Sequence, residues 1–406
     1  MDTKSIGKNL ALLRRKSGLT QAQVAEKLNV SDKTVSKWES GHGFPEITQF
    51  PALSELFGVS IDYLMRGERR GIVIAGNALV DIVKTIDVYP KVGMLASISS
   101  VSRAVGGCVP NVGIDLAKID RSIPITAAAK VGDDEYGRYL VSKLGQYGID
   151  TKGVSVSGNM PTGFSDVMSL PSGDRTFFHA RGANAEFGPD DIELDGLDCS
   201  ILHIGYIMLL DTFDQPDEEY GTVMARFLHD VKGRGIKTSV DVVSSSTLDY
   251  GAMIRPALKY SDYLVINEIE CCGIWGLEPY TADGKLNIEN IKKAIELTAA
   301  EGVSEKIVVH SKSAGWCYDV PTSTFTFVPS LEIPKEQIKG SVGAGDAYCA
   351  GCLYGIYNGY DDKLMLEFAS AAAACNLFAE NSIDGMREKK AIMQMLQEYK
   401  RKQIKF

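Results

Sequence analysis

The sequence lacks any hydrophobic run long enough to span a membrane. Its longest apolar stretch, from Phe368 to Ala379, is short and rich in alanine, and the first residues carry no apolar core like that of a signal peptide. We therefore expect a cytoplasmic protein that does not bind membranes. The composition, 45% hydrophobic and 23% charged, is that of a globular protein. Because 406 residues exceed what one hydrophobic core usually serves, at least two domains are expected.

Histidine is scarce, and cysteine follows no disulfide pattern. The five histidines stand singly, without the spacing of metal ligands, so we interpret none of them as a ligand and assign no side chain as a direct metal ligand. The eight irregularly spaced cysteines are typical of small buried side chains in an intracellular protein. Cys349 and Cys352 form a C-x-x-C pair that could be redox-active or half of a zinc site. Since no second pair completes four ligands, a structural role is favoured.

Positive charge is in the minority, and it is concentrated near the N-terminus. The net charge is −9, but the 11 basic and 8 acidic residues among residues 1–70 give +3, which leaves 32 basic and 44 acidic residues, or −12, for the remainder. A local basic excess is what binding to a phosphate backbone requires, although +3 is a small excess.

Residues 1–67 carry apolar side chains at helical spacing in several short groups, which predicts an all-α bundle of short helices. Boundary residues separate these groups. Gly18 follows the first helix, Thr20 is placed to cap the second, and Ser31 is placed to cap the third, which ends at Gly41.

The segment TQAQVAEKLNVSDKTVSKWESG resembles the helix-turn-helix of Cro and the phage repressors (XRE type), and the likeness covers most of residues 1–67. It implies a DNA-binding domain, with Thr20 to Leu28 as the support helix and Ser31 to Ser40 as the recognition helix in the major groove of an operator. Thr20 and Gln21 would lie against phosphates. The residues that would face the groove are Asp32, Lys33, Thr34, Ser36 and Lys37. The alternative for the lysines is a solvated helix face.

From Gly71 onward, short β-rich runs alternate with helical stretches. Runs that are buried on both faces and separated by helices predict a parallel sheet in an α/β sandwich. Residues 81–107 and 162–182 instead alternate apolar and polar side chains around turn signals, with a hairpin turn expected at Pro171 to Asp174. These two stretches predict a small separate sheet.

The glycine-rich segment GSVGAGDAYCAG, residues 340–351, runs directly into a predicted helix. Gly343, Ala344 and Gly345 can direct N–H groups at a phosphate, with the positive end of the helix dipole behind them. Asp346 follows at once, where a carboxylate could take a proton from a hydroxyl that attacks the terminal phosphate of ATP. The alternative is a helix N-terminus with an ordinary first-turn Asp.

This segment and several other blocks resemble, in the right order, the ribokinase-like (PfkB) carbohydrate kinases. They are GNALVD at 76–81, GGCVPN at 106–111, INEIE at 266–270 and GAGD at 343–346. The resemblance implies a three-layer α/β/α sandwich with a small β-sheet lid over residues 71–390, preceded by the all-α helix-turn-helix domain. Residues 391–406 would form a C-terminal helix and basic tail.

The resemblance also implies roles for single residues. Asp81, Gly106, Gly107 and Asn111 would bind the sugar. Asn267 and Glu270 would help to organise Mg²⁺ and phosphate, largely through water. Gly343, Ala344 and Gly345 would form the anion hole, and Asp346 would be the catalytic base.

Two departures from the family pattern concern the nucleotide side. Gly340 and Ser341 replace an Asp-Thr pair whose Asp commonly contributes to a monovalent-cation site, so dependence on such a cation is left open. The usual T-x-G-x-x-G strand end, which lines the nucleotide, aligns with residues 310–315, where Gly315 is kept and Lys312 replaces a glycine. Lys312 could neutralise phosphate or simply be an exposed loop lysine.

The sequence therefore predicts an ATP- and Mg²⁺-dependent sugar or nucleoside kinase that also binds double-stranded DNA and has a transcription-regulatory role. The alternative is a sugar- or nucleotide-sensing regulator with little or no kinase activity. A homodimer is expected because one half-site read by one monomer is short.

Overall fold

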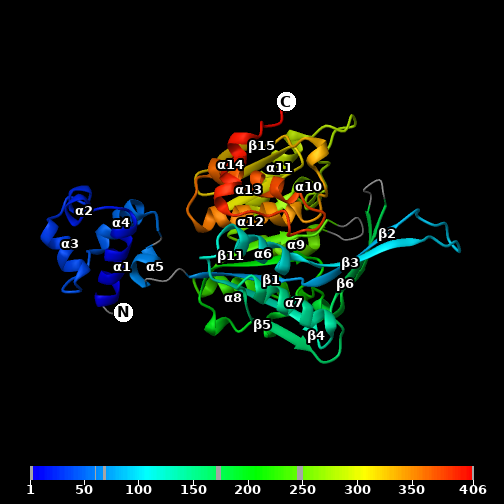
Figure 1. Ribbon diagram of the computed structural model, residues 1–406, viewed down its shortest axis with the longest axis horizontal. Helices are drawn as coiled ribbons and strands as arrows, with labels where there is room; N and C mark the ends of the chain where they lie inside the picture. The colour runs from blue at the N-terminus through cyan, green and yellow to red at the C-terminus, as the bar shows by residue number, and fades with distance from the viewer. Residues whose placement is uncertain (1–2, 60, 67–69, 171–174, 245–249, 405–406) are drawn as a thin grey trace. The chain divides into compact units, whose positions relative to one another are not determined.

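The computed structural model describes residues 3–59, 61–66, 70–170, 175–244 and 250–404 (Figure 1). The chain divides into two compact units, Met1–Arg70 and Gly71–Phe406. The hairpin turn expected at Pro171 to Asp174 lies outside the described residues. Among those residues, no helix is both long and apolar enough to cross a membrane.

The N-terminal unit is a bundle of short helices around a single apolar core. Its α-helices are α1 (Thr3–Lys16), α2 (Gln21–Lys27), α3 (Asp32–Glu39), α4 (Phe50–Phe57) and α5 (Ile61–Arg66). Leu10, Val24, Val35, Trp38 and Leu53 are among the buried side chains where these helices meet. The predicted all-α bundle is confirmed.

The caps of α2 and α3 also agree with the prediction. The hydroxyl of Thr20 accepts a hydrogen bond from the backbone N–H of Gln23, and the Gln23 side chain accepts one from the N–H of Thr20. The Ser31 hydroxyl accepts from the N–H of Thr34 at 3.1 Å. These bonds fix where both helices of the expected helix-turn-helix begin.

The larger unit contains a nine-stranded sheet in the order β15-β14-β13-β12-β11-β8-β1-β4-β5. Its strands are β1 (Gly71–Gly76), β4 (Ile125–Gly132), β5 (Asp150–Ser157), β8 (Cys199–Ile207), β11 (Lys237–Val242), β12 (Tyr263–Asn267), β13 (Lys306–His310), β14 (Ala314–Asp319) and β15 (Thr324–Pro329). All neighbours from β13 to β5 pair in parallel, but β14 and β15 pair antiparallel. The predicted parallel sheet is therefore a mixed sheet with an antiparallel edge. The outermost strand, β15, is only partly buried, so it lacks the continuous apolar run that reveals a buried parallel strand.

Helices cover both faces of this sheet. They are α6 (Cys108–Ile119), α7 (Glu135–Gln146), α8 (Val223–Gly233), α9 (Tyr250–Leu258), α10 (Glu268–Gly273), α11 (Ile288–Glu301), α12 (Ala344–Tyr357), α13 (Asp362–Asn376) and α14 (Lys389–Glu398). One apolar cluster contains buried side chains of α6, α7, α12, α13 and α14. A second contains buried side chains of α8, α9, α10 and α11. The predicted three-layer α/β/α sandwich is confirmed. Ile392 and Met395 of α14 are fully buried in the first cluster, so the C-terminal helix belongs to this sandwich.

A small four-stranded sheet, in the order β3-β2-β6-β7, forms the expected lid. Its strands are β2 (Leu79–Ile86), β3 (Ile98–Gly106), β6 (Phe164–Ser169) and β7 (Arg175–Ala180). The hairpin of β2 and β3 projects from the sandwich (Figure 1). The remaining short elements are the pair β9 (Pro216–Asp217) and β10 (Gly221–Thr222) and the 3-10 turns Ile47–Gln49, Gly182–Glu186, Pro189–Asp191, Leu194–Gly196 and Lys335–Gln337.

Candidate active site and DNA-binding surface

The glycine-rich loop ends at the N-terminus of α12, as the sequence predicts. Gly343 is the N-cap residue and has a left-handed backbone with φ of 77°. A Cβ atom on Gly343 would lie 2.4 Å from the Cβ of Ser382, so a larger residue does not fit. The first N–H groups of a helix have no partner within it, and the helix dipole is positive there. Residues 343–345 can therefore hold a phosphate.

Asp346 lies in the first turn of the same helix and is only 7% exposed. Its Oδ2 accepts a hydrogen bond of 2.8 Å from Asn111 Nδ2, and the hydroxyl of Tyr206 donates to both oxygens, at 2.8 and 3.0 Å. Burial raises the pKa of Asp346 to about 6, and the negative charge of Asp241 adds to the rise, while the hydrogen bonds oppose it. Asp346 is thus ionised at neutral pH but basic enough to accept a proton.

Asn111 connects this carboxylate to the loop that follows α13. The Asn111 Oδ1 accepts a hydrogen bond of 2.7 Å from the hydroxyl of Ser382, which is itself buried. Ser382 also packs against Gly343, so it touches both the expected sugar side and the phosphate side. No sequence motif pointed to Ser382.

Asp81 lies on β2, a strand of the lid. A Cβ on Gly106 would lie 2.5 Å from Asp81 Oδ2, and one on Gly107 would lie 2.6 Å from the carbonyl oxygen of Asn77. Gly107, whose φ is 86°, is therefore required by close packing whether or not it touches a ligand, whereas Gly106 lies directly against the Asp81 carboxylate. Burial raises the pKa of Asp81 to about 7, and the charge of Asp346 adds to it. The two carboxylates are near enough to affect each other's protonation.

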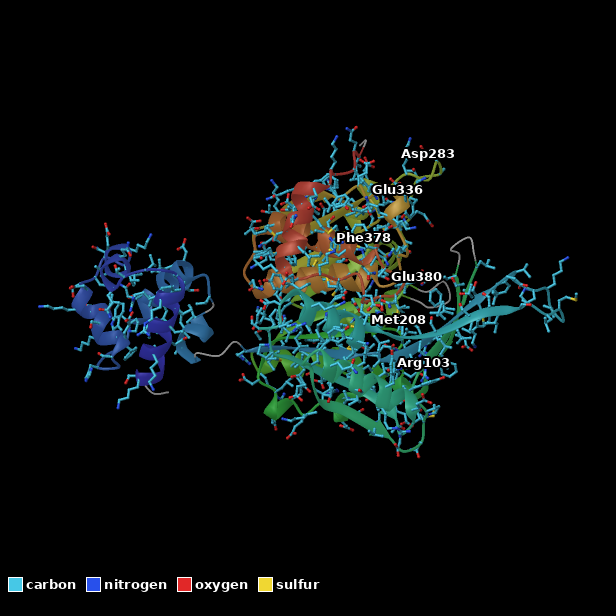
Figure 2. The ribbon with its side chains drawn as sticks, viewed as in Figure 1. Arg103, Met208, Asp283, Glu336, Phe378 and Glu380 are labelled. Carbon is cyan, nitrogen blue, oxygen red and sulfur yellow. The ribbon has the colours of Figure 1, made fainter. Side chains whose placement is uncertain are left out.

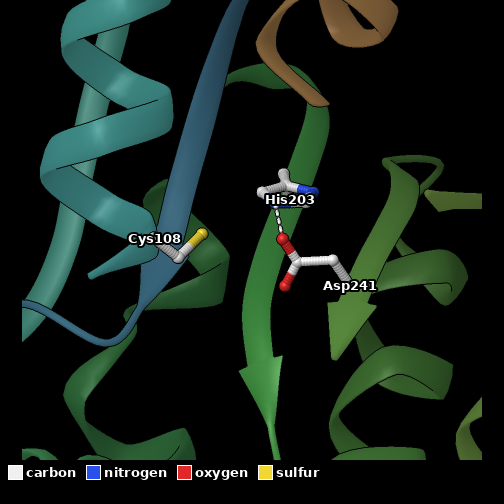
Figure 3. A group of neighbouring side chains, drawn as sticks. All are labelled: Cys108, His203 and Asp241. Atoms are coloured by element: carbon white, nitrogen blue, oxygen red, sulfur yellow. Dashed lines mark ion pairs between the residues drawn. The ribbon is translucent and has the colours of Figure 1, made fainter. Parts of the chain in front are cut away.

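Three further polar side chains lie close together, on α6, β8 and β11 (Figure 3). The donor atoms of Cys108, His203 and Asp241 all lie within 4.8 Å of one another, and all three residues are buried. His203 Nε2 is 3.6 Å from Asp241 Oδ2, and its Nδ1 is hydrogen-bonded to Ser239 at 3.0 Å. These donor types suit a soft metal ion, but only if Cys108 loses its proton, and burial raises the pKa of that thiol well above its usual value.

A cavity of about 280 Å³ opens beside Asp346 at the C-terminal ends of β8, β11, β12 and β13. Ligands of open α/β sheets bind at this edge. Burial lowers the pKa of His310 to about 4, so its ring, which stacks on Tyr348, is neutral. The lining residues that matter for function are Tyr206, Asp241, Asn267, Glu270, His310 and residues 343–346.

Asn267 and Glu270 form the N-terminal capping box of α10. The Asn267 side chain accepts from the N–H of Glu270, and the Glu270 carboxylate accepts from the N–H of Asn267, each at 2.9 Å. Ser244 donates to the second Glu270 oxygen at 2.7 Å. Burial raises the pKa of Glu270 to about 8. Both side chains are committed to this network, which suits an indirect role in organising a metal ion.

Two positions of the aligned 310–315 segment lie away from the cavity lining. Gly315 lies in β14, where a Cβ would be 2.0 Å from the hydroxyl of Tyr348, so packing alone accounts for this glycine. Lys312 is exposed. The cysteines of the C-x-x-C pair, Cys349 and Cys352, are both buried free thiols of α12, and the Sγ of Cys349 lies 3.7 Å from His203 Nε2.

The recognition helix presents a polar face to solvent. Asp32, Lys33, Ser36 and Lys37 are exposed, and Thr34 is half-buried against Ser31. In the turn before the support helix, the Thr20 hydroxyl is used in its cap. The Gln21 side chain donates to Glu39, which also pairs with Arg14 at 2.6 Å. The Gln21 side chain thus points into the unit, and only its backbone is left for a phosphate.

The sandwich with its small lid has the fold of the ribokinase-like kinases. The sandwich resembles a ribokinase of Arabidopsis thaliana solved with ribose and ATP (TM-score 0.68, 23% identity, covering 81% of this chain and 99% of that one). It also resembles a putative ribokinase II of E. coli solved with ATP and Mg²⁺ (TM-score 0.65, 20% identity, covering 81% and 99%).

Residues 74–389 match the model of the pfkB family of carbohydrate kinases, and the chain belongs to that family. Residues 10–64 match a helix-turn-helix family model. Among curated proteins, the chain is similar to the ribokinase of Arabidopsis thaliana, at 25% identity over 80% of each chain. It is also similar to the 5-dehydro-2-deoxygluconokinase of Shouchella clausii, at 21% identity over 82% of this chain and 97% of that one.

Proposed function

We propose that the larger unit transfers the γ-phosphoryl group of ATP to a hydroxyl of a sugar or sugar derivative. The observation that carries this proposal is the placement of Asp346: it is a buried carboxylate that directly follows an anion-binding loop and contacts Asn111. A proton acceptor and a phosphate cradle are therefore adjacent, as phosphoryl transfer to a hydroxyl requires.

Each residue then has a definite task. Asp81 and Asn111 hold the sugar below the lid, with Gly106 and Gly107 permitting close approach. Asp346 accepts the proton of the attacking hydroxyl. The N–H groups of Gly343, Ala344 and Gly345, supported by the α12 dipole, stabilise the negative charge that develops on the phosphoryl oxygens.

The cavity beside Asp346 suits the proposed nucleotide. Its lining combines the anion loop with the end of β13 and the start of α10. A bound ATP would supply the phosphoryl group, and Asn267 and Glu270 would hold Mg²⁺ through water, where the ion would supply positive charge. Gly315 is proposed to support the nucleotide site from β14. Whether a monovalent cation contributes is a question for a KCl titration of the activity.

Turnover of ATP with a panel of sugars and nucleosides tests the proposal. The names of the relatives place monosaccharides and keto-deoxy sugar acids first in the panel. We expect turnover on one compound that is lost in Asp346→Asn. An Asp346→Asn protein with normal turnover would contradict the assigned base.

We also propose that the N-terminal unit binds a DNA operator and regulates transcription. The match of residues 10–64 to a helix-turn-helix family and the exposed lysines of α3 support this. Occupancy of the kinase site by sugar or nucleotide would change the affinity for the operator. Operator selection from random DNA, followed by titrations with and without sugar and nucleotide, tests both parts. An affinity that no ligand changes would exclude the coupling, and would remove the sensor alternative with it.

A homodimer is part of the same proposal. The lid leaves large apolar side chains exposed, with Val101, Phe177 and Phe178 each more than half exposed. A second copy that covers these side chains would also provide two recognition helices for two half-sites. Light scattering during gel filtration should give twice the monomer mass of 44.1 kDa. For the domains, we propose 1–67, 71–390 and a C-terminal segment 391–406 whose helix packs on the sandwich.

A further inference from the structure

The turn at the end of β8 has an unusual backbone. Tyr206 has φ of 66° and Met208, which is labelled in Figure 2, has φ of 84°; both lie in the left-handed region that residues other than glycine seldom adopt. Such strain persists only where surrounding contacts hold it, and it concentrates at functional sites. We therefore expect that the position this turn gives to a side chain explains its conformation.

Two carboxylates hold this turn. Asp241 Oδ1 accepts a hydrogen bond of 2.7 Å from the backbone N–H of Tyr206. The carboxylate of Asp214 accepts from the N–H groups of Met208 and Leu210, each at 3.0 Å. Because both acceptors are carboxylates, these bonds are of the stronger, charge-assisted kind.

The turn directs the Tyr206 ring at Asp346. The hydroxyl donates to both carboxylate oxygens, at 2.8 and 3.0 Å, whereas Asn111 donates only to Oδ2. Sharing one hydroxyl between the two oxygens lets Tyr206 stay bonded to Oδ2 while Oδ1 receives a proton. Tyr206 also lines the cavity proposed for the nucleotide.

We propose that Tyr206 is a positioning residue for the base, which orients the Asp346 carboxylate toward the acceptor hydroxyl, and that Asp241 holds Tyr206 in that position. This inference rests on the proposed kinase function. In the transfer step, the acceptor O–H bond breaks and its proton goes to Asp346, while the new O–P bond forms and the bond from the γ-phosphorus to ADP breaks. Tyr206 keeps its own proton throughout.

The surroundings of Asp346 determine in which direction each substitution should change its pKa. The titratable groups that face it are Asp81 on β2, Cys108 and Asp115 on α6, His203 on β8, Asp241 on β11 and Cys349 on α12. Burial raises the pKa of Asp346 and the charge of Asp241 raises it further, while the Tyr206 hydrogen bond lowers it. Tyr206→Phe should therefore raise this pKa. Asp241→Asn keeps an oxygen to accept the Tyr206 N–H but removes a negative charge, so it should lower the pKa.

The first test is the pH profile of kcat/KM with the best substrate of the panel. We expect the acidic limb of Tyr206→Phe to move up by about one pH unit, with KM for the sugar little changed. The limb of Asp241→Asn should move down. Tyr348→Phe is the matched control, because Tyr348 is a buried tyrosine of α12 whose hydroxyl has no hydrogen-bond partner among the described residues. An unmoved limb in Tyr206→Phe would overturn the inference.

The second test does not need turnover. Carboxyl ¹³C NMR of Asp-labelled full-length protein, with the Asp346 signal assigned from Asp346→Asn, measures the same pKa directly. If the natural protein turns over no sugar but Tyr206→Phe still raises this pKa and Asp241→Asn lowers it, the proposed kinase function fails and the Tyr206 contact stands. If turnover is normal and neither variant moves the pKa, the inference about Tyr206 fails alone.

Discussion

The two units of the chain build their sites in opposite ways. In the N-terminal unit, the residues expected to face the major groove follow one another along α3, and nearly all of them are exposed. In the larger unit, the residues around Asp346 come from β2, α6, β8, β11 and α12 and are mostly buried. A surface site therefore depends on one helix, whereas the kinase site depends on the packing of the whole sandwich. Substitutions should act locally in the first unit and broadly in the second.

Asp346→Asn should give the largest difference between the effect on kinase activity and the effect on DNA binding. Loss of a general base commonly costs about 10²- to 10⁴-fold in rate, so kcat should fall by that factor. The affinity of the ligand-free protein for its operator should stay the same, because the substitution lies in the other unit. Steady-state kinetics and a DNA-binding titration on one preparation measure both. Equal losses in the two assays would break the comparison.

Gly343→Ala should show how far packing controls the kinase site. A left-handed alanine costs about 1–2 kcal/mol, and here the new methyl group also meets Ser382. We expect a clear drop in the free energy of unfolding and at least about tenfold weaker nucleotide binding. Gly359→Ala is the matched control, since φ is 68° but nothing lies within 4 Å of its Cβ position. Chemical denaturation should show a smaller loss for the control, and equal losses would exclude the clash.

Asp81→Asn measures how much the burial of a carboxylate in the larger unit lowers the free energy of unfolding. The folded-state pKa of Asp81, about 7, lies above the usual value for Asp, so the folded protein binds a proton that the unfolded chain has released. This group therefore contributes less stability as the pH rises from about 4 to 7. Asp81→Asn should be more stable than the natural protein at pH 8, by up to about 2 kcal/mol, and nearly equal at pH 4. Thermal unfolding at both pH values measures this, while sugar binding should be lost.

The smallest effects should come from the exposed lysines of α3. Lys33→Ala and Lys37→Ala should each weaken operator binding and lower the slope of log K against log salt by about 0.9 if each lysine contacts one phosphate. Lys8→Ala, on an exposed position of α1, is the control and should change neither. Kinase kinetics should be unaffected in all three. If the slope of log K against log salt is unchanged in both α3 variants, these lysines belong to a solvated helix face that does not contact DNA.

Local features of the site could be predicted from the sequence, and distant contacts could not. The caps at Thr20 and Ser31 and the loop before Asp346 depend on neighbouring residues, so their patterns are visible in the chain. Tyr206 reaches Asp346 across 140 positions, and Ser382 reaches Asn111 across 271. Asp241 alone had a local signal, as an acidic residue near the end of a predicted buried strand. The sequence did not predict the edge strand β15, because a partly buried strand lacks the continuous apolar run of a buried one.

The place of β1 in the sheet has a mechanical consequence. The strand begins at Gly71, where the larger unit begins, and it lies between β8 and β4 in the interior of the sheet. A pull on the chain at this point would load the hydrogen bonds to both neighbours at once, in shear, instead of peeling one edge strand away. The smaller unit is therefore joined to the larger one through an interior strand, and extracting that strand would break hydrogen bonds on both of its sides at once.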